Sequence, residues 1–175
     1  MMNIVLVGFM GTGKTVVGRR LAERLNMIFV DLDSLIEEKL KLSVNEIFER
    51  FGERFFREVE RGIVSQISNR RGLVVATGGG VVLDSRNVAT LKKLGCMIHL
   101  FARPDVILER TRDTHHRPLL ETGDRKIRIE HLLNERRPFY TQAHCEIDTS
   151  DLDVEDVAGK IIRYLQESCH GPRTG

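Results

Sequence analysis

The sequence predicts one α/β domain built around a parallel sheet. Short apolar runs alternate along the chain with amphipathic stretches of helical period, and the first run leads into a glycine-rich loop and then a helix. Strand followed by helix, repeated, is typical of a parallel sheet with helices on both faces. The chain has 175 residues, of which 41% are hydrophobic and 30% charged. A chain of that length can bury a core without a metal or disulfide.

Five brief apolar runs are the predicted strands. Each is rich in residues that favour strands and is bounded by Gly, Asp or Arg. They cover residues 4–7, 27–30, 73–76, 97–101 and, less clearly, 145–147.

The predicted helices lie between these runs, where apolar residues recur every three or four positions. The apolar faces are Val17, Leu21 and Leu25; Phe56, Val59, Ile63 and Ile67; Val88, Leu91 and Leu94; and Val157, Ile161 and Leu165. Gly95 is expected to stop the third helix, and Asp153 to cap the last one. Residues 168–175 have no apolar face and are expected to form a flexible tail.

Two segments break the alternation and are therefore expected to serve function. Residues 33–71 hold about three helical patterns, more than one crossover between strands needs. Residues 110–124 are polar and without a clear period, as expected for a mobile lid.

Composition excludes several classes of protein. Lys and Arg total 27 against 25 Asp and Glu, so a formal net charge of +2 gives no field for general nucleic-acid binding. The apolar runs are too short for a transmembrane helix, and no cleavable signal pattern opens the chain. Three widely spaced cysteines are expected to be reduced thiols. We therefore expect a cytoplasmic protein that binds neither membrane nor nucleic acid.

The strongest motif is a phosphate-binding loop. Residues 8–15 match G-x-x-x-x-G-K-[ST] at every fixed position, after a predicted strand and before a predicted helix. Backbone N–H groups of such a loop surround the phosphates, the lysine adds a positive charge, and the threonine hydroxyl ligates Mg²⁺. The predicted ATP-binding residues here are Gly11, Thr12, Gly13, Lys14 and Thr15. The alternative is a glycine-rich turn with an exposed lysine, which the flanking strand and helix disfavour.

Asp31 and Asp33 end the second predicted strand, and ligands bind beyond the carboxyl ends of parallel strands. If the strand continues to Asp33, both carboxylates point the same way, one toward a metal and the other toward an acceptor hydroxyl. The alternative is a strand end followed by a helix that Asp33 caps. The phosphate loop upstream favours the functional interpretation.

Each of the remaining candidate site residues, taken by itself, also has an ordinary structural interpretation. Arg57 lies off the centre of its helix's apolar stripe, with Glu60 three residues on, an arrangement that also describes a surface ion pair. Gly78–Gly80 follow the third strand and permit a backbone to lie against a ligand, or form a simple tight turn. Arg117, before Pro118, belongs to the predicted lid. His115 and His116 beside it are interpreted as lid surface, because no third metal ligand lies at a useful spacing.

Taken together, these motifs resemble the shikimate kinases, of the nucleoside-monophosphate-kinase group of P-loop proteins. The resemblance extends to about residue 165 and rests on the combination of Asp31-x-Asp33, Phe56-Arg57, Gly78–Gly80, Arg117-Pro118-Leu119-Leu120 and Arg136-x-Pro138-x-Tyr140. It implies a three-layer P-loop kinase fold with strand order 2-3-1-4-5, in a single domain over residues 1–167. It also implies a substrate-binding segment at about 33–61 and a lid at about 110–124.

The implied reaction is transfer of the γ-phosphoryl group of ATP to the 3-hydroxyl of shikimate, with one Mg²⁺ ion, by a monomer. The resemblance implies that Lys14 and Thr15 serve the phosphates and Mg²⁺, and that Asp31 holds the metal through water. On the acceptor side, it implies that Asp33 binds the hydroxyls and helps take up the proton, that the carboxylate is clamped by Arg57 and Arg136 beside Gly79 and Gly80, and that the pocket walls are Phe48 and Phe56. It further implies that Arg117 reaches the transferring phosphate and that Arg110 lies near adenine.

Two points stay open at this level. The residues alone do not decide whether Arg136 or Arg137 faces the cleft, although family spacing favours Arg136. Residues 150–153 lack the arginine that several family members place against adenine, which leaves the adenine loop unassigned.

Two rival functions remain. A gluconate-type or nucleotide-type kinase of the same fold would not need the clamp of Arg57 and Arg136. A non-catalytic nucleotide-binding module would have no reason to keep Asp33 together with Arg117.

Overall fold

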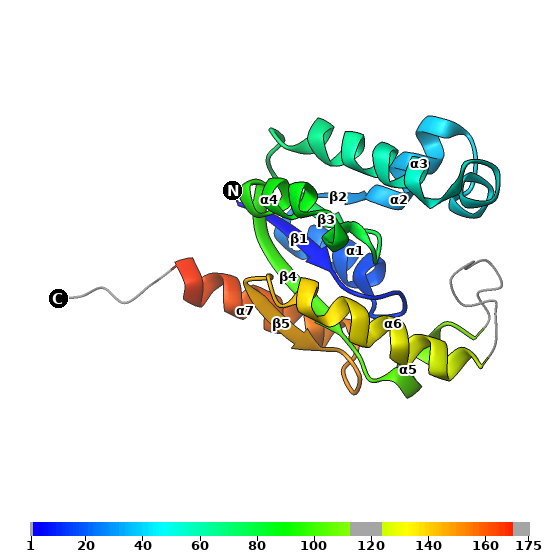
Figure 1. Ribbon diagram of the computed structural model, residues 1–175. Helices are drawn as coiled ribbons and strands as arrows, with labels where there is room; N and C mark the ends of the chain where they lie inside the picture. The colour runs from blue at the N-terminus through cyan, green and yellow to red at the C-terminus, as the bar shows by residue number, and fades with distance from the viewer. Residues whose placement is uncertain (1, 113–123, 170–175) are drawn as a thin grey trace.

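A computed structural model of the chain describes residues 2–112 and 124–169 (Figure 1). In chain order the elements are β1 (Asn3–Val7), α1 (Lys14–Leu25), β2 (Ile28–Asp31), α2 (Leu32–Leu40), α3 (Val44–Ile67), β3 (Leu73–Ala76), the 3₁₀ turn η1 (Val81–Leu83), α4 (Ser85–Leu94), β4 (Gly95–Phe101), α5 (Pro104–Arg110), α6 (Arg125–Tyr140), β5 (Cys145–Asp148) and α7 (Val154–Cys169).

The five strands form one parallel sheet in the order β2-β3-β1-β4-β5, which confirms the predicted class and order. β1 lies in the centre, where Val5 pairs with Val75 of β3 and Met97 of β4. The chain runs from β1 to one side of the sheet through β2 and β3, and then crosses to the other side with β4. In such sheets the ligand crevice lies beyond the carboxyl ends of the strands, where the order reverses. The loop after β1 lies at this place.

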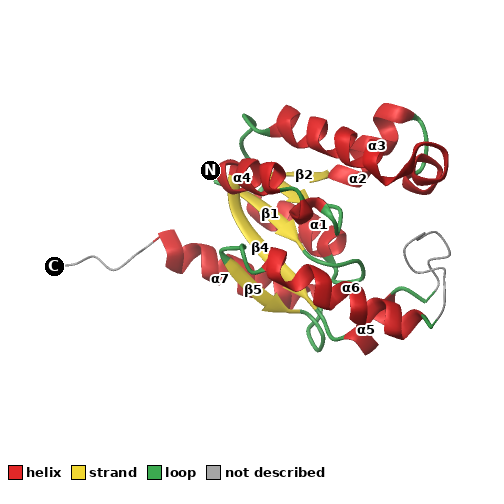
Figure 2. Cartoon of the chain, in the orientation of Figure 1, coloured by secondary structure: helices red, strands yellow, loops and turns green. Residues whose placement is uncertain are grey.

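Helices cover both faces of the sheet (Figure 2). Alternate residues of β1 point to opposite faces because side chains alternate along a strand. Val5 and Val7 pack in a cluster with residues of α2, α3 and α4, whereas Ile4 and Leu6 pack with residues of α1 and α7. A third, smaller cluster joins Phe9 and Met10 of the loop after β1 to α5 and α6. That cluster fixes the loop against the side of the molecule opposite α2 and α3 (Figure 1).

Most predicted boundaries lie within two residues of those observed. β4 begins at Gly95, directly after α4, and β5 extends to Asp148. Residues 33–71 contain the three predicted helical stretches, because Gly52, at φ 78° and ψ 170°, interrupts α3. The expectation that β2 continues to Asp33 is wrong: β2 ends at Asp31, whose carboxylate caps α2 through the N–H groups of Asp33 and Ser34. Because the side chain of Asp31 caps the N–H groups two and three residues later, the helix begins directly after Asp31 and the strand cannot extend further.

The remaining boundaries concern the ends of the described segments. Asp153 caps α7 as predicted, accepting a hydrogen bond from the N–H of Asp156 at 2.8 Å. α7 reaches Cys169, two residues into the segment expected to be a tail, and residues 170–175 lie outside the described residues. Within the described part of the chain, no helix combines the length and apolar character needed to span a membrane.

Candidate active site

The loop between β1 and α1 has the geometry of a phosphate-binding loop. Gly8 lies so close to β4 that a side chain there would strike the Leu100 carbonyl, and Gly13, at φ 89°, precedes α1 without a side-chain cap. No side chain therefore caps the first N–H groups of α1, and they face the loop at the positive end of the helix. Nζ of Lys14 donates to the Phe9 carbonyl at 2.8 Å, folding back over the loop. All five ATP-binding candidates of the loop lie in this turn or at the start of α1.

Asp31 and Asp33 lie beside this loop, although the strand does not continue to Asp33. Oγ1 of Thr15 donates to Oδ2 of Asp31 at 2.9 Å, which links α1 to the end of β2. Asp33 lies in the first turn of α2. A cavity of about 200 Å³ is lined by both aspartates together with Lys14 and Thr15. Both carboxylates therefore lie beside the loop, as predicted, but the start of α2 places them there and not a longer β2.

A second cavity, of about 340 Å³, adjoins the first. It is also lined by Asp33, and it brings together side chains of α2, α3 and α6 and the glycine backbone of the turn after β3. Its walls include the substrate-binding candidates Asp33, Arg57, Gly79, Gly80 and Arg136 and the two aromatic candidates Phe48 and Phe56. These aromatic rings lie 4.8 Å apart, centre to centre.

Arg57 is held by two carboxylates of its own helix. Nη1 contacts Glu60 at 3.0 and 3.2 Å, and Nη2 contacts Glu53 at 2.9 Å. Glu60 has no exposed surface, so its pair with Arg57 is not the surface ion pair of the alternative interpretation. Burial raises the pKa of Glu60 to about 7, against the lowering effect of Arg57 and with a further increase from Asp33 and Asp84. Sequence reasoning missed Glu53, although its i−4 spacing from Arg57 is a readable signal.

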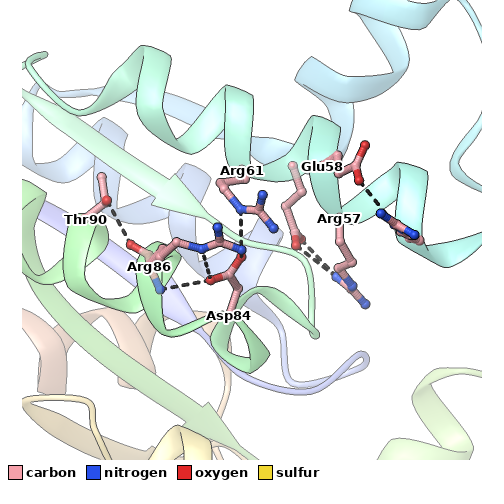
Figure 3. Close-up of polar contacts among 8 residues, drawn as sticks. Arg57, Glu58, Arg61, Asp84, Arg86 and Thr90 are labelled. Atoms are coloured by element: carbon pink, nitrogen blue, oxygen red, sulfur yellow. Dashed lines mark hydrogen bonds and ion pairs between the residues drawn. The ribbon is translucent and has the colours of Figure 1, made fainter.

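A second ion-pair cluster holds the neighbouring turn (Figure 3). Asp84 accepts from Arg61 of α3 at 2.8 Å and from the Arg86 side chain at 3.1 Å. These hydrogen bonds, that of Arg86 first, lower the pKa of Asp84 to about 2. The cluster joins α3 to the start of α4, so it fixes the segment after Gly80 against the helix that carries Arg57.

Arg136, and not Arg137, lines the cavity that contains Arg57. Its side chain is 5% exposed and its guanidinium lies 5.6 Å from the ring centre of Phe9. The Nε of Arg136 is buried and has no hydrogen-bond partner among the residues described. Leaving such a donor unsatisfied costs free energy. Arg137 is exposed and lines a separate cavity.

Arg110 joins the phosphate loop to the end of β5. Its guanidinium donates to the Thr149 carbonyl at 2.7 Å and to the Gly11 carbonyl at 3.4 Å. The neighbouring loop 150–153, which lacks an arginine, instead receives Arg103, which pairs with Asp151 at 2.6 and 2.9 Å. Nothing in the sequence pattern pointed to Arg103. Arg117, with the rest of 113–123, lies outside the described residues.

The parallel sheet, the loop between β1 and α1, and the adjoining acidic and basic cavity define a P-loop kinase. The family model for shikimate kinase matches residues 10–166. The chain belongs to the shikimate kinase family.

Shikimate kinases of other organisms are similar in sequence and structure to nearly the whole of this chain. The shikimate kinase of Caldanaerobacter subterraneus is 50% identical over 93% of this chain and 95% of its own length. That of Caldicellulosiruptor saccharolyticus is 48% identical over 93% and 94%. A solved structure, the shikimate kinase of Acinetobacter baumannii in complex with shikimate, has a TM-score of 0.91 and 38% identity, and covers 95% of this chain and 93% of that one.

Proposed function

We propose that this enzyme transfers the γ-phosphoryl group of ATP to the 3-hydroxyl of shikimate and that the residues lining the two cavities perform the steps. The observation that carries the assignment is the 340 Å³ cavity, where Asp33 and the arginines Arg57 and Arg136 meet beside the phosphate loop. A small hydroxylated carboxylate matches this set, since guanidinium groups bind carboxylates in bidentate fashion and an aspartate receives a hydroxyl. Phosphoryl transfer needs positioning and charge neutralisation more than covalent chemistry.

The roles follow from position. The N–H groups of Gly11, Thr12 and Gly13 and the ammonium of Lys14 would bind the phosphates. Asp33 would accept the acceptor hydroxyl's proton as the oxygen bonds to the γ-phosphorus and the bond from that phosphorus to ADP breaks. Arg110 would lie near adenine, and Arg117, from the predicted lid, would contact the transferring phosphate.

The carboxylate is assigned to Arg57, Arg136 and the backbone of Gly79 and Gly80. The presence of all four residues in the walls of one cavity supports this assignment most directly.

The residues present fit one Mg²⁺ ion. Thr15 and Asp31 offer a hydroxyl and a carboxylate oxygen in contact with each other, next to Lys14. No group of three or more His, Cys, Asp or Glu among the described residues could hold a metal by itself, and Mg²⁺ in kinases is held by few protein ligands together with phosphate and water. Thr15 would ligate the ion directly and Asp31 through water. When bound, Mg²⁺ neutralises charge on the phosphates.

The proposal also covers organisation. Residues 1–167 would form one domain, with a substrate-binding segment at 33–61 and a lid at 110–124, acting as a monomer in the cytoplasm. α2 and α3 supply several walls of the 340 Å³ cavity, which supports the substrate-binding segment. Light scattering of the purified enzyme tests the monomer.

The deciding experiment measures ADP release with ATP and Mg²⁺ against a panel of acceptors: shikimate, gluconate and nucleoside monophosphates. We expect saturable release with shikimate alone and its loss on adding a metal chelator. A gluconate-type or nucleotide-type kinase would instead respond to its own acceptor, and a binding module to none. An analogue of shikimate without the carboxylate tests the clamp: wild type and Arg136→Ala should use it about equally poorly. Full discrimination retained by Arg136→Ala would exclude Arg136 as the partner of the carboxylate and leave Arg57 as the clamp to test.

A further inference from the structure

Tyr140 lies behind the acceptor cavity and takes part in none of the roles assigned above. It is one turn after Arg136 on α6, and its side chain is 2% exposed. Its hydroxyl donates to the carbonyl of Gly79 at 2.5 Å, across 61 residues of sequence. This bond ties the helix that carries Arg136 to the turn that carries Gly79 and Gly80.

The bond sets the direction of a second group. The peptide between Gly79 and Gly80 is trans, and in a trans peptide the C=O and the N–H point in opposite directions. Fixing the Gly79 carbonyl on Tyr140 therefore fixes the N–H of Gly80 on the side away from Tyr140. Burial raises the pKa of Tyr140 to about 12, opposed by the nearby Arg136, so the hydroxyl keeps the proton that it donates.

The Tyr140 ring is itself held from behind. The imidazole of His99 on β4 stacks on it with ring centres 4.5 Å apart and planes 11° from parallel. Nδ1 of His99 lies 2.9 Å from Oε1 of Glu146, the residue opposite it on β5. Burial lowers the pKa of His99 against the raising effect of Glu146. A cavity of about 450 Å³ lies along this stack and is lined by Tyr140, His99 and Glu146, but not by Arg57 or Arg136.

We infer that Tyr140 is a positioning residue for the acceptor carboxylate, holding the Gly79–Gly80 peptide in register with Arg136 while His99 and Glu146 hold its ring. This inference rests on the proposed function, because it assumes that the carboxylate binds at Arg57, Arg136 and the two glycines. It assigns Tyr140 no contact with substrate. A stacked ring is a stiff support, because moving it means breaking both the stack and the hydrogen bond.

The test is Tyr140→Phe, which removes one oxygen and keeps the ring. We expect the KM for shikimate to rise about tenfold, with kcat within about threefold of wild type and the KM for ATP unchanged, since a misplaced ground-state contact weakens uniform binding. The shikimate analogue without a carboxylate should be used equally well by wild type and variant. A purely structural role would lower the melting temperature and leave the shikimate KM alone.

The chain offers a matched control. Tyr164, the other tyrosine, also donates to a backbone carbonyl, that of His144, at 2.9 Å, and it lines neither cavity of the candidate active site. Tyr164→Phe should leave both KM values unchanged. An equal rise in shikimate KM in the two variants, or none in Tyr140→Phe, overturns the inference.

A second variant covers a Tyr140→Phe protein that does not fold. His99→Ala removes the ring behind the phenol and leaves the hydroxyl in place, and it should raise the shikimate KM in the same direction but less. An unchanged shikimate KM in a folded His99→Ala protein would then refute the inference. The wild-type enzyme separates the two proposals. If its ADP release does not respond to shikimate, the proposed function is wrong. If the wild type responds normally and the variant has the same shikimate KM, only the role of Tyr140 is wrong.

Discussion

Gly80→Ala is expected to disable the carboxylate clamp without unfolding the protein. A Cβ at Gly80 would lie 2.6 Å from Cζ of Arg57 and 2.7 Å from its Nη1, and closer still to Nη2. Real contacts are not that short, so the guanidinium must move. Gly80 itself has φ −103°, which alanine adopts without strain. The displaced guanidinium pairs with the buried Glu60, so we expect the variant to lose about 1–3 kcal/mol of stability and still to fold.

The variant should also bind the acceptor more weakly. A hydrogen bond to a charged group contributes about 1.5–3 kcal/mol, and each 1.4 kcal/mol is a factor of ten, so the KM for shikimate should rise about 10- to 100-fold. The KM for ATP should stay the same, since Arg57 lines the acceptor cavity and not the one beside Lys14. Initial rates of ADP release at saturating ATP measure the first value, and thermal melting measures stability.

Two further variants isolate the cause. Gly62→Ala, on the same helix as Arg57, adds a Cβ that meets nothing within 4 Å and should leave the KM unchanged. In an Arg57→Ala background, Gly80→Ala should add little, since both changes act through one side chain. If the two effects instead multiply, the new methyl group acts on the substrate directly and the reasoning from Arg57 is refuted. An unchanged KM in Gly80→Ala alone would remove Arg57 from the clamp.

Three further predictions follow from the same contacts. Lys14→Ala should lower turnover by about 10²-fold or more while the melting temperature holds, because the ammonium neutralises phosphate charge; near-wild-type ADP release would contradict the phosphate-loop assignment. Asp33→Asn should lower kcat by about 10²- to 10⁴-fold and leave ATP binding unchanged by calorimetry, as expected for the group that takes the proton; a retained kcat would leave Asp33 a binding role only. Folded Glu60 keeps its proton to about pH 7, whereas the unfolded chain releases it near 4.5, so the free energy of unfolding should fall, by at most about 3 kcal/mol, as pH rises through that window. Urea melts of wild type and Glu60→Gln should therefore differ in their pH slopes, and parallel slopes would show that Glu60 does not titrate there.

The sequence was sufficient for features that depend on neighbours along the chain. The strand, glycine-rich loop and helix around Lys14 are local, and so are the apolar faces of α1, α4 and α7. The spacing of Arg57 and Glu60 is one helical turn, so their contact was readable as well. The sequence did not show that this pair is buried, since burial depends on what packs over α3.

Where local signals compete, the sequence was misleading. Asp31 and Asp33 fit a strand end as well as a helix start, and the capping bonds of Asp31 decided for the helix. Both carboxylates nevertheless reach the cavity beside the phosphate loop, because α2 begins at the carboxyl end of β2.

Tertiary structure alone decided which distant residues meet. It chose Arg136 over Arg137, because only one of two adjacent helix positions faces the cavity once α6 is docked. It also brought Tyr140 to Gly79 and stacked His99 behind it, across 61 and 41 positions of sequence in which no pattern links them. Periodicity and spacing report which face of an element is apolar, and they contain no information on how two such faces are turned toward each other. That orientation is set when side chains from several elements pack together at once.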